Sequence, residues 1–369
     1  MIINTPPKTK IMHITHGLGG IQTYLEYILR YSDNTIFEYI IVAPGNPAFQ
    51  NFCAPFAKYY PLKVKREVNP FADVFLLVKL IRLIKKEKPD LLHVHSAKGG
   101  LLGRLAARLC HVKSIYTPHG FSYLSFTGIK RTFFFMLECI ARNWGTVLLA
   151  VSHSEANRAV FEIGYLPGKV RVILNSIYTN GQLVKRDYDS NYRIGMIGRL
   201  TYQKNPMLFM EIAEALLVKY PHLQFSILGA GLDDHLGTQL NDFISSRNLQ
   251  AKINLLPWGN SNTSKNFIED TDIFVMTSVF EGLPFSLLEA MAGECVCVVS
   301  KADGNSDVIQ NNENGFACLS KEEFCNNIES LILSKTLREK FGKAGRKYIF
   351  EKHSIHTAMQ HLQNLYKNL

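Results

Sequence analysis

Features that would place the chain among exported or membrane-spanning proteins are missing from its sequence. The N-terminal segment has no basic head followed by an apolar stretch and a small-residue cleavage site, so we expect no export. The best candidate for a spanning helix, residues 133–151, is interrupted by Glu138 and Arg142, whereas such a helix needs about 18 uninterrupted apolar residues. Lipid-anchoring motifs are also missing. We therefore expect a cytoplasmic protein.

Disulfide and nucleic-acid-binding patterns are missing as well. The seven cysteines are an odd number without a repeated Cys-x-x-Cys spacing, which indicates buried thiols in a reducing compartment. The sequence contains no arginine-rich helix, zinc-binding spacing or aromatic RNA-binding motif, so we exclude nucleic acid as a partner.

The positive charge of the chain, +10 in all, is concentrated in its first half. Residues 1–180 hold 22 Lys and Arg against 10 Asp and Glu, whereas residues 181–369 hold 19 against 21. Such an excess suits an anionic partner: lipid headgroups, a polyphosphate-linked acceptor or nucleic acid, of which the lack of the motifs above excludes the last. Basic and apolar residues are mixed in 79–88 and 127–143, so we expect peripheral contact with the inner face of the cell membrane; an ordinary solvated surface is the alternative.

Short strand-like apolar runs alternate with longer segments of helical period, which is typical of a parallel sheet. The alternation stops after Asn175 in a polar segment and restarts near Tyr192, and two doubly wound sheets fit this break better than one barrel. The prediction is an α/β protein with four parts: an N-terminal Rossmann-like domain over 1–175, a linker over 176–192, a second Rossmann-like domain over 193–350, and a C-terminal helix over 351–369 that returns to the first domain.

The second half carries a cluster of anion-binding residues. Gly198-Arg199 ends the first strand of that half, and Lys204 follows after a short polar turn. Cations at the carboxyl end of a parallel sheet can neutralise a diphosphate and stabilise it as it departs. Gly229-Ala230-Gly231 and Trp258 end the next strands and would bring loops to the same edge of the sheet.

The most informative segment runs from Glu281 to Glu289. Pro284 is preset for the first helical turn, so we expect Glu281 in the loop before a helix and Glu289 inside it. Two carboxylates placed in this way can accept hydroxyl hydrogen bonds from both ends of a polyhydroxylated ligand, while the amides at the start of the helix face anionic oxygens.

These motifs resemble, in order, those of family 4 retaining glycosyltransferases, which have the GT-B fold of two Rossmann-like domains facing across a cleft. The resemblance spans the chain and rests on Gly19-Gly20, His119, Val151-Ser152-x-Ser154-Glu155, Gly198-Arg199 with Lys204-Asn205, and Glu281 to Glu289. It implies transfer of a sugar from a nucleotide diphosphate donor, for which we favour UDP, without a cofactor or a metal.

The resemblance also implies roles for individual residues. Arg199 and Lys204 would bind the donor diphosphate, and Glu289 the ribose. Glu281 would contact the transferred sugar, and His119 would hydrogen-bond a sugar hydroxyl. The further donor contacts would come from loop glycines and their neighbours: Gly19, Gly20, Gly198, Gly229, Gly231, Trp258, Gly282, Leu283 and Pro284.

The segment 90–104 resembles members of the family that extend polyprenyl-diphosphate-linked sugars in bacterial surface polysaccharide synthesis. His95, Lys98 and Arg104 are therefore candidates for acceptor binding. Physically, Lys98 and Arg104 would follow the carboxyl end of a strand, where they could face an acceptor diphosphate. Helix-start surface residues are the alternative.

Departures and rival interpretations remain. The family often has Gly-Gly-x-x-Glu after the second carboxylate, where this chain has Gly304-Asn305-Ser306-Asp307. Asp187-Tyr188-Asp189 has the metal-binding spacing of another glycosyltransferase fold but lies in the expected linker, so we expect no metal there. An isomerase acting on a nucleotide sugar and a transferase with a soluble acceptor are the nearest alternatives. A dehydrogenase is disfavoured because the first glycine loop is incomplete.

Overall fold

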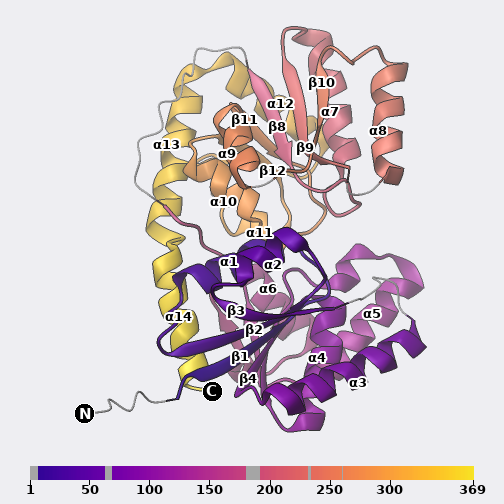
Figure 1. The fold of residues 1–369 in the computed structure, drawn as a ribbon. Helices are drawn as coiled ribbons and strands as arrows, with labels where there is room; N and C mark the ends of the chain where they lie inside the picture. The colour runs from indigo at the N-terminus through magenta and orange to yellow at the C-terminus, as the bar shows by residue number, and fades with distance from the viewer. Residues whose placement is uncertain (1–6, 63–68, 180–191, 232–233, 260) are drawn as a thin grey trace. The chain divides into compact units, whose positions relative to one another are not determined.

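The structure is a computed structural model that describes residues 7–62, 69–179, 192–231, 234–259 and 261–369 (Figure 1). It divides into two compact units, of which the first is Met1–Asn175 with Ile355–Leu369 and the second is Ser176–Ser354. Each unit is built on one sheet whose neighbouring strands are all parallel. The predicted fold class, two parallel α/β sheets in succession, is confirmed.

In the described residues of the first unit, the sheet has seven strands in the order β3-β2-β1-β4-β5-β6-β7. The strands are β1 (Thr9–Ile14), β2 (Phe37–Ala43), β3 (Ala57–Pro61), β4 (Leu91–His95), β5 (Lys113–Thr117), β6 (Val147–Ala150) and β7 (Val170–Val172). The helices are α1 (Gly20–Tyr31), α2 (Pro47–Cys53), α3 (Pro70–Glu87), α4 (Ala97–Cys110), α5 (Gly128–Ala141), α6 (His153–Asn157) and α14 (Ile355–Lys367), with short helical turns at Ser122–Ser125, Arg158–Ile163 and Pro167–Lys169.

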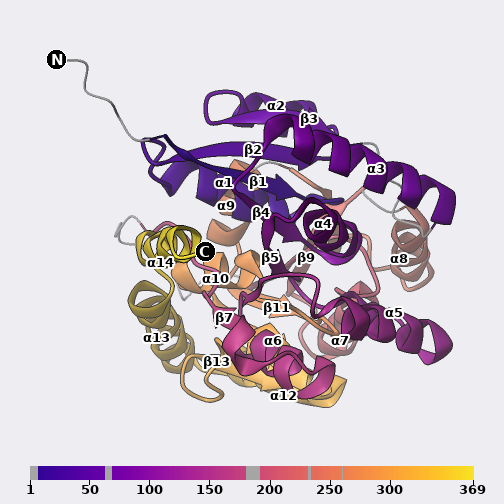
Figure 2. The same cartoon turned by 90° about the horizontal axis from the view of Figure 1, so that it is seen from below.

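The two faces of this first sheet differ in chemistry, because successive side chains of a strand point to opposite faces. Met12 of β1 and Val94 of β4 belong to an apolar core that includes side chains of α3 and α4. The alternate positions of the same strands carry His13, His93 and His95, all fully buried. Aromatic rings of α1 and α14 cover this polar face, and Figures 1 and 2 show α14 on the side of the unit away from α3, α4 and α5.

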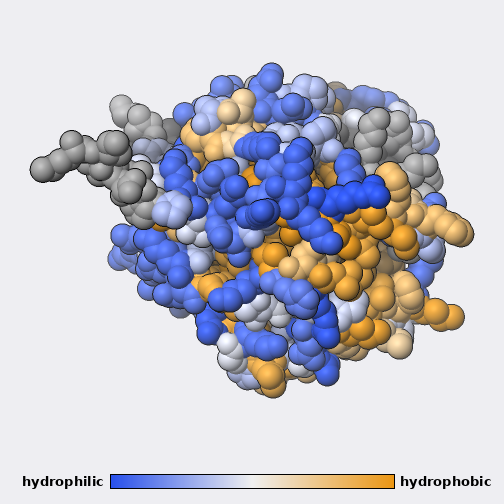
Figure 3. Space-filling view, turned by 60° about the horizontal axis from the view of Figure 1, so that its bottom comes forward, coloured by the Kyte–Doolittle hydropathy of each residue, from blue (hydrophilic) through white to orange (hydrophobic). Residues whose placement is uncertain are grey.

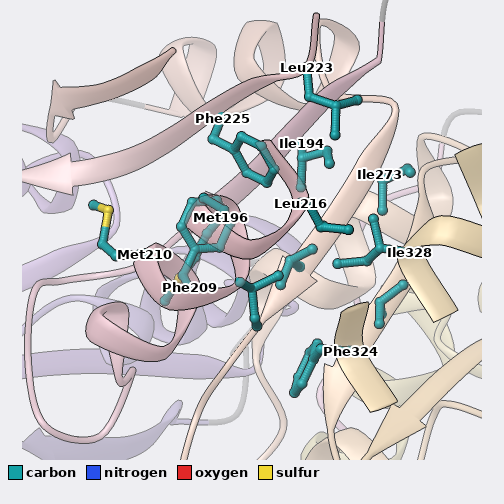
Figure 4. Packing of buried hydrophobic residues seen from close by; sticks show 14 of the residues in the cluster. Ile194, Met196, Phe209, Met210, Leu216, Leu223, Phe225, Ile273, Phe324 and Ile328 are labelled. Carbon is teal, nitrogen blue, oxygen red and sulfur yellow. The ribbon is translucent and has the colours of Figure 1, made fainter. Parts of the chain in front are cut away.

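The sheet of the second unit, as far as the structure describes it, has six strands in the order β10-β9-β8-β11-β12-β13. They are β8 (Arg193–Ile197), β9 (Gln224–Ala230), β10 (Ile253–Pro257), β11 (Ile273–Met276), β12 (Val296–Ser300) and β13 (Gly315–Cys318), with helices α7 (Pro206–Lys219), α8 (Asp234–Ser246), α9 (Ser261–Glu269), α10 (Phe285–Ala292), α11 (Asp303–Ser306), α12 (Lys321–Leu333) and α13 (Lys335–Lys352). Figure 4 shows the core, where Phe209, Phe225 and Phe324 pack with aliphatic side chains from the strands.

The apolar runs of the sequence do not single out three of these strands, namely β3, β7 and β13. All three are short and lie at or next to a sheet edge, where few apolar residues need to be buried and the sequence pattern is correspondingly weak. Helix α3 also begins earlier than its apolar period suggests. The Asn69 side chain accepts a hydrogen bond from the Ala72 amide (3.1 Å), and Pro70 fits the first helical position.

Candidate active site

The donor-site candidates of the second unit gather where β8 and β11 lie side by side. The strand order reverses there, and open parallel sheets bind ligands at such a point, beyond the carboxyl ends of the strands. The loop after β8 is fastened to the loop after β11. The Thr277 hydroxyl donates to the carbonyls of Lys204 (3.0 Å) and Asn205 (2.8 Å), and the Val279 amide donates to the Gln203 carbonyl (2.8 Å).

An ion pair joins the two loops through their side chains. Lys204 Nζ lies 2.6 Å from Glu281 Oε1, and both side chains are mostly buried. Gln203 Nε2 donates to the Phe280 carbonyl (3.2 Å) and lies 3.4 Å from Glu281 Oε2. Because the carboxylate is held by both neighbours, its position is fixed before any ligand binds, as electrostatic preorganisation requires. Sequence reasoning identified Lys204 and Glu281 but missed Gln203 and Thr277, which carry no motif of their own.

Glycines allow the segments at the ends of β8 and β9 to approach one another closely. A Cβ at Gly198 would lie 3.1 Å from the Lys204 side chain, so Gly198 leaves room for that side chain beside the end of β8. Gly229 has φ +146°, and a Cβ there would overlap the Gly198 carbonyl oxygen. Gly231 and Trp258 follow at the ends of β9 and β10, the Trp258 amide donating to the Ala230 carbonyl (3.0 Å).

The segment from Glu281 to Glu289 has the predicted local structure. Pro284 precedes the first turn of α10, which begins at Phe285, so Glu281 lies in the loop and Glu289 within the helix. The Glu289 side chain is partly buried, and burial raises its pKa from the ordinary 4.5 to about 7. A carboxyl that exchanges its proton near neutral pH can both donate to and accept from a ligand hydroxyl.

The departure at residues 304–307 has a structural account. A Cβ at Gly304 would overlap the Gly282 carbonyl, so this glycine lets the short helix α11 pack against the loop that carries Gly282 and Leu283. Asn305 is fully buried, and its amide nitrogen lies 3.2 Å from the Ser300 carbonyl and 3.3 Å from the Ser300 hydroxyl. Asn305 therefore ties α11 to the end of β12.

Arg199, the other residue predicted to bind the diphosphate, directly follows Gly198 and is partly buried.

His119 of the first unit follows β5 in an unusual conformation. Its φ is +56°, in the left-handed region that non-glycine residues seldom adopt. The next amide, that of Gly120, donates to Glu155 Oε1 (2.6 Å), while Glu155 Oε2 accepts from the Val151 amide (2.8 Å). Glu155, which is buried, thus holds the His119 loop onto the end of β6. Strained backbone fixed by its surroundings is found at functional sites.

The imidazole of His119 is fixed from the other side by a chain of buried histidines. His119 Nε2 lies 3.1 Å from His95 Nδ1, and His95 Nε2 lies 3.0 Å from His13 Nδ1. His93 stands beside this chain and pairs with the Thr117 hydroxyl (2.8 Å) and with the Tyr366 hydroxyl (2.7 Å) of the C-terminal helix. Sequence reasoning missed His13, which the parallel pairing of β1 with β4 places opposite His93.

His95, the first candidate for acceptor binding, lies inside the fold. His95 is fully buried, and both its ring nitrogens are engaged by histidines. Lys98 also differs from expectation, because its ammonium lies 2.6 Å from Asp73 Oδ1 of α3 and only 11% of its side chain is exposed. Neither residue presents an unpaired polar group to a ligand.

Arg104, the third candidate for acceptor binding, also lies inside the fold. Arg104 is fully buried; it donates to Glu138 Oε2 (2.9 Å) and to the Tyr165 hydroxyl (2.8 Å), and its guanidinium stacks 3.8 Å from the centre of the Tyr116 ring. The reason lies in the glycines of α4, since a Cβ at Gly100 would overlap the Tyr116 ring. The helix therefore packs against the sheet on its glycine face, which includes position 104.

The remaining candidates are less constrained. Gly19 precedes α1 with φ +92°, and a Cβ at Gly20 would meet no atom within 4 Å, so the turn leaves space around the helix start. Asp187 and Asp189, considered for a metal, lie outside the described residues. Ring nitrogens of His13, His93 and His95 come within 4.8 Å of one another, the grouping among the described residues best suited to a metal ion.

No helix in the described parts of the chain combines the length and the apolar character needed to cross a bilayer.

Sequence and structure comparisons identify the relatives of the chain. The model for glycosyl transferases group 1 matches residues 184–348, and the model for glycosyltransferase family 4 matches residues 18–180.

Individual relatives agree with these models. The UDP-Gal:α-D-GlcNAc-diphosphoundecaprenol α-1,3-galactosyltransferase of Escherichia coli is 31% identical over 332 residues, covering 85% of this chain and 84% of the relative. The capsular polysaccharide biosynthesis glycosyltransferase CapM of Staphylococcus aureus is 25% identical over 322 residues, covering 83% of each. The crystal structure of Anabaena HepE in complex with UDP-glucose matches with a TM-score of 0.81 at 17% identity, over 98% of this chain and 100% of that one. These relatives give no support to the isomerase alternative, and the chain belongs to glycosyltransferase family 4, as an enzyme with the GT-B fold.

Proposed function

We propose that the enzyme transfers a sugar from a UDP-sugar to a polyprenyl-diphosphate-linked saccharide, with retention of anomeric configuration, in the synthesis of a bacterial surface polysaccharide. The observation that carries the donor half is the fastened pair of loops after β8 and β11, with Lys204 and Glu281 at their centre. The E. coli relative, whose name specifies UDP-Gal and a diphosphoundecaprenol-linked GlcNAc, supports the acceptor half.

The proposed roles follow from the charges that the site offers. Arg199 and Lys204 stabilise the diphosphate as negative charge develops on it. Glu281, held by Lys204 and Gln203, accepts hydrogen bonds from the transferred sugar. Glu289 binds the ribose hydroxyls, with the backbone of residues 282–284 and the glycines that end β8 and β9 lining the site. His119 donates a hydrogen bond to a sugar hydroxyl, and Gly19 and Gly20 contact the phosphates.

The test measures release of free UDP by the purified enzyme. A panel of UDP-, GDP- and dTDP-sugars is supplied with and without a synthetic polyprenyl-diphosphate sugar. We expect release of UDP from one UDP-sugar that depends on the lipid-linked acceptor, and a product whose new linkage has the anomeric configuration of the donor. Conversion of the donor sugar to an isomer without acceptor, or inversion of the linkage, would refute the proposal.

We further propose that α3 and α5 bind an anionic membrane surface. Both helices pack against α4 and expose large apolar side chains, among them Phe71 (90% exposed), Phe75 (70%) and Ile129 (90%). Figure 3 shows hydrophobic residues gathered at the right of the view. Figures 1 and 2 place α3 and α5 on the same side. Exposed basic residues accompany them, namely Lys79, Arg82, Lys85, Lys86, Lys88, Lys130 and Arg131. Apolar groups flanked by cations suit the headgroup region of an anionic bilayer.

Vesicle co-sedimentation tests this surface. The enzyme should bind phosphatidylglycerol vesicles, and this binding should weaken as the salt concentration is raised. It should bind phosphatidylcholine vesicles only weakly. Changing Phe71 and Phe75 together to Ser should weaken binding at least about tenfold, because each ring loses a burial worth about 1.5–3 kcal/mol. Val218→Ser, which removes another exposed apolar side chain from α7, is the control; an equal loss in both variants would contradict the proposal.

A further inference from the structure

A continuous chain of imidazoles runs from the interior of the first sheet to the loop after β5. His13 Nδ1 meets His95 Nε2 at 3.0 Å, and His95 Nδ1 meets His119 Nε2 at 3.1 Å. His13 and His95 are fully buried, whereas His119 is partly exposed. The outer nitrogen of His119, Nδ1, has no hydrogen-bond partner in the described parts of the structure. The chain therefore ends on a nitrogen that a ligand can use.

Burial keeps these rings neutral. It lowers the pKa of His13 and of His119 to about 3. Burial also lowers the pKa of His95, and the nearby histidines lower it further because a second positive ring would be repelled. A neutral imidazole has one N–H and one bare nitrogen. In a chain of such rings, the tautomer of one ring consequently fixes the tautomer of the next.

The inner end of the chain decides its direction. His13 Nε2 is buried and has no hydrogen-bond partner among the described residues. If its proton were on Nε2, a buried N–H would be left unpaired, and such donors are rarer in proteins than under-used acceptors. The proton therefore belongs on His13 Nδ1, where it donates to His95 Nε2. His95 then carries its proton on Nδ1 and donates to His119 Nε2, which leaves the proton of His119 on Nδ1.

We propose that His13 and His95 are positioning residues that hold His119 as the Nδ1–H tautomer, so that it presents a donor to a sugar oxygen. The inference rests on the proposed role of His119 in transfer. It explains the buried polar face of β1 and β4, because a rigid donor of known direction discriminates between ligand oxygens in a way that a freely rotating, solvated imidazole does not. The Glu155 carboxylate fixes the backbone of the same loop and so completes the support.

The rival interpretation is a metal ion at His13, His93 and His95. Both nitrogens of His93 lie within 2.8 Å of hydroxyl oxygens, and both nitrogens of His95 face other imidazoles at hydrogen-bonding distance. A cation would have to take nitrogens away from these partners. The hydrogen-bonded chain accounts for the contacts without that loss, and metal binding becomes an outcome of the test.

Nuclear magnetic resonance of the full-length protein labelled with ¹⁵N-histidine reads the tautomers directly. The His119, His95 and His13 signals are assigned by single substitutions among the 12 histidines. We expect all three as neutral Nδ1–H forms from pH 6 to pH 8, although exposed histidines favour Nε2–H. An Nε2–H form of His13 or His119 would overturn the proposal. So would stoichiometric metal in the purified protein together with ring-nitrogen shifts that disappear on chelation.

Substitution of His95 tests whether this residue positions the His119 imidazole. His95→Leu removes the donor to His119 Nε2. An Nε2–H facing leucine would be unpaired, so we expect the Nδ1–H form to remain while the ring loses its anchor, and kcat to fall by up to about tenfold, the range of one neutral hydrogen bond. In His95→Asn the amide N–H takes the place of Nδ1–H, and it should restore most of kcat. An unchanged kcat in His95→Leu, or no recovery in His95→Asn, would overturn the positioning role of His95. If the leucine variant does not fold, the tautomers and kcat of the wild type and of His95→Asn decide.

The two proposals fail separately. The tautomers are measured without substrate, so Nδ1–H forms in an enzyme that releases no UDP would refute the proposed reaction and leave the histidine chain standing. Normal acceptor-dependent release of UDP with His119 in the Nε2–H form would refute the histidine chain and leave the proposed reaction standing.

Discussion

Replacing Arg104 with methionine should destabilise the first unit severely, because it strands a buried carboxylate. Glu138, which is 4% exposed, accepts from Arg104 at one oxygen and from the Tyr116 hydroxyl (2.8 Å) at the other. Removing one partner of a buried ion pair costs about 3–5 kcal/mol. With a typical urea dependence of about 2 kcal/mol per molar, the midpoint of unfolding of the first unit should fall by about 2 M.

The two tryptophans of the chain allow each unit to be followed alone. Trp144 belongs to the first unit and Trp258 to the second, so a Trp258→Phe background makes fluorescence report on the first unit. In this background Arg108→Met, an exposed arginine one turn further along α4, is the matched control and should change stability by less than about 0.5 kcal/mol.

A second substitution isolates the cause of the loss. Adding Glu138→Gln to Arg104→Met removes the stranded charge while keeping an oxygen for Tyr116, so the double variant should recover more than half of the lost stability. The reasoning would be refuted if Arg104→Met unfolded like the Arg108→Met control. It would also fail if that variant kept its stability while the KM for a lipid-linked acceptor rose, since Arg104 would then contact the acceptor.

Three further predictions concern the second unit. Arg199→Ala should lower kcat about 10²–10³-fold, the usual effect of removing a preorganised charge from a leaving group; Arg193→Ala, which removes a half-exposed guanidinium at the opposite end of β8, should leave UDP release near normal. Because the folded state raises the pKa of Glu289 from 4.5 to about 7, the contribution of this group to stability is fully present below pH 4.5 and is lost as pH rises through 7. Urea unfolding followed by Trp258 should therefore show about 2 kcal/mol less stability from this group at pH 8 than at pH 5.5, and Glu289→Gln should abolish that difference. Gly304→Ala should displace the loop at 281–283 and weaken donor binding in calorimetry with UDP, whereas Ser306→Ala in the same short helix should not.

The edge of the sheet that carries the donor-site candidates of the second unit could be predicted from local sequence signals. Apolar runs mark β8 and β11, and Gly198-Arg199 and Glu281 directly follow those two strands, so the rule for ligand sites in parallel sheets places them together. What cannot be deduced is the hydrogen bonding between the loops. Gln203 and Thr277 are common polar residues, and their pairing depends on two strands that are adjacent in the sheet but separated by some seventy residues in the chain.

The first unit shows a different limit. The sequence signals that β4 ends at His95, but it does not show which face of α4 meets the sheet. Gly100 and Gly103 are the clue, because small residues one turn apart on a helix favour close packing. Arg104 lies on that same face, and its burial follows from the packing. The partner of His95 is set by the register of β1 against β4, which no local pattern reports.

Part of the basic excess of the first half is used inside the fold. Arg104 and Lys98, the cations of the predicted acceptor motif, are neutralised by Glu138 and Asp73 within the fold. Among the cations exposed on the surface of the first unit, those of α3 and α5 lie beside exposed apolar side chains. On the proposed membrane surface of α3 and α5, the long-range attraction that the net charge creates would act on anionic headgroups as well as on one bound diphosphate. For the proposed lipid-linked acceptor, concentration of the enzyme at the membrane would then supply much of the encounter rate.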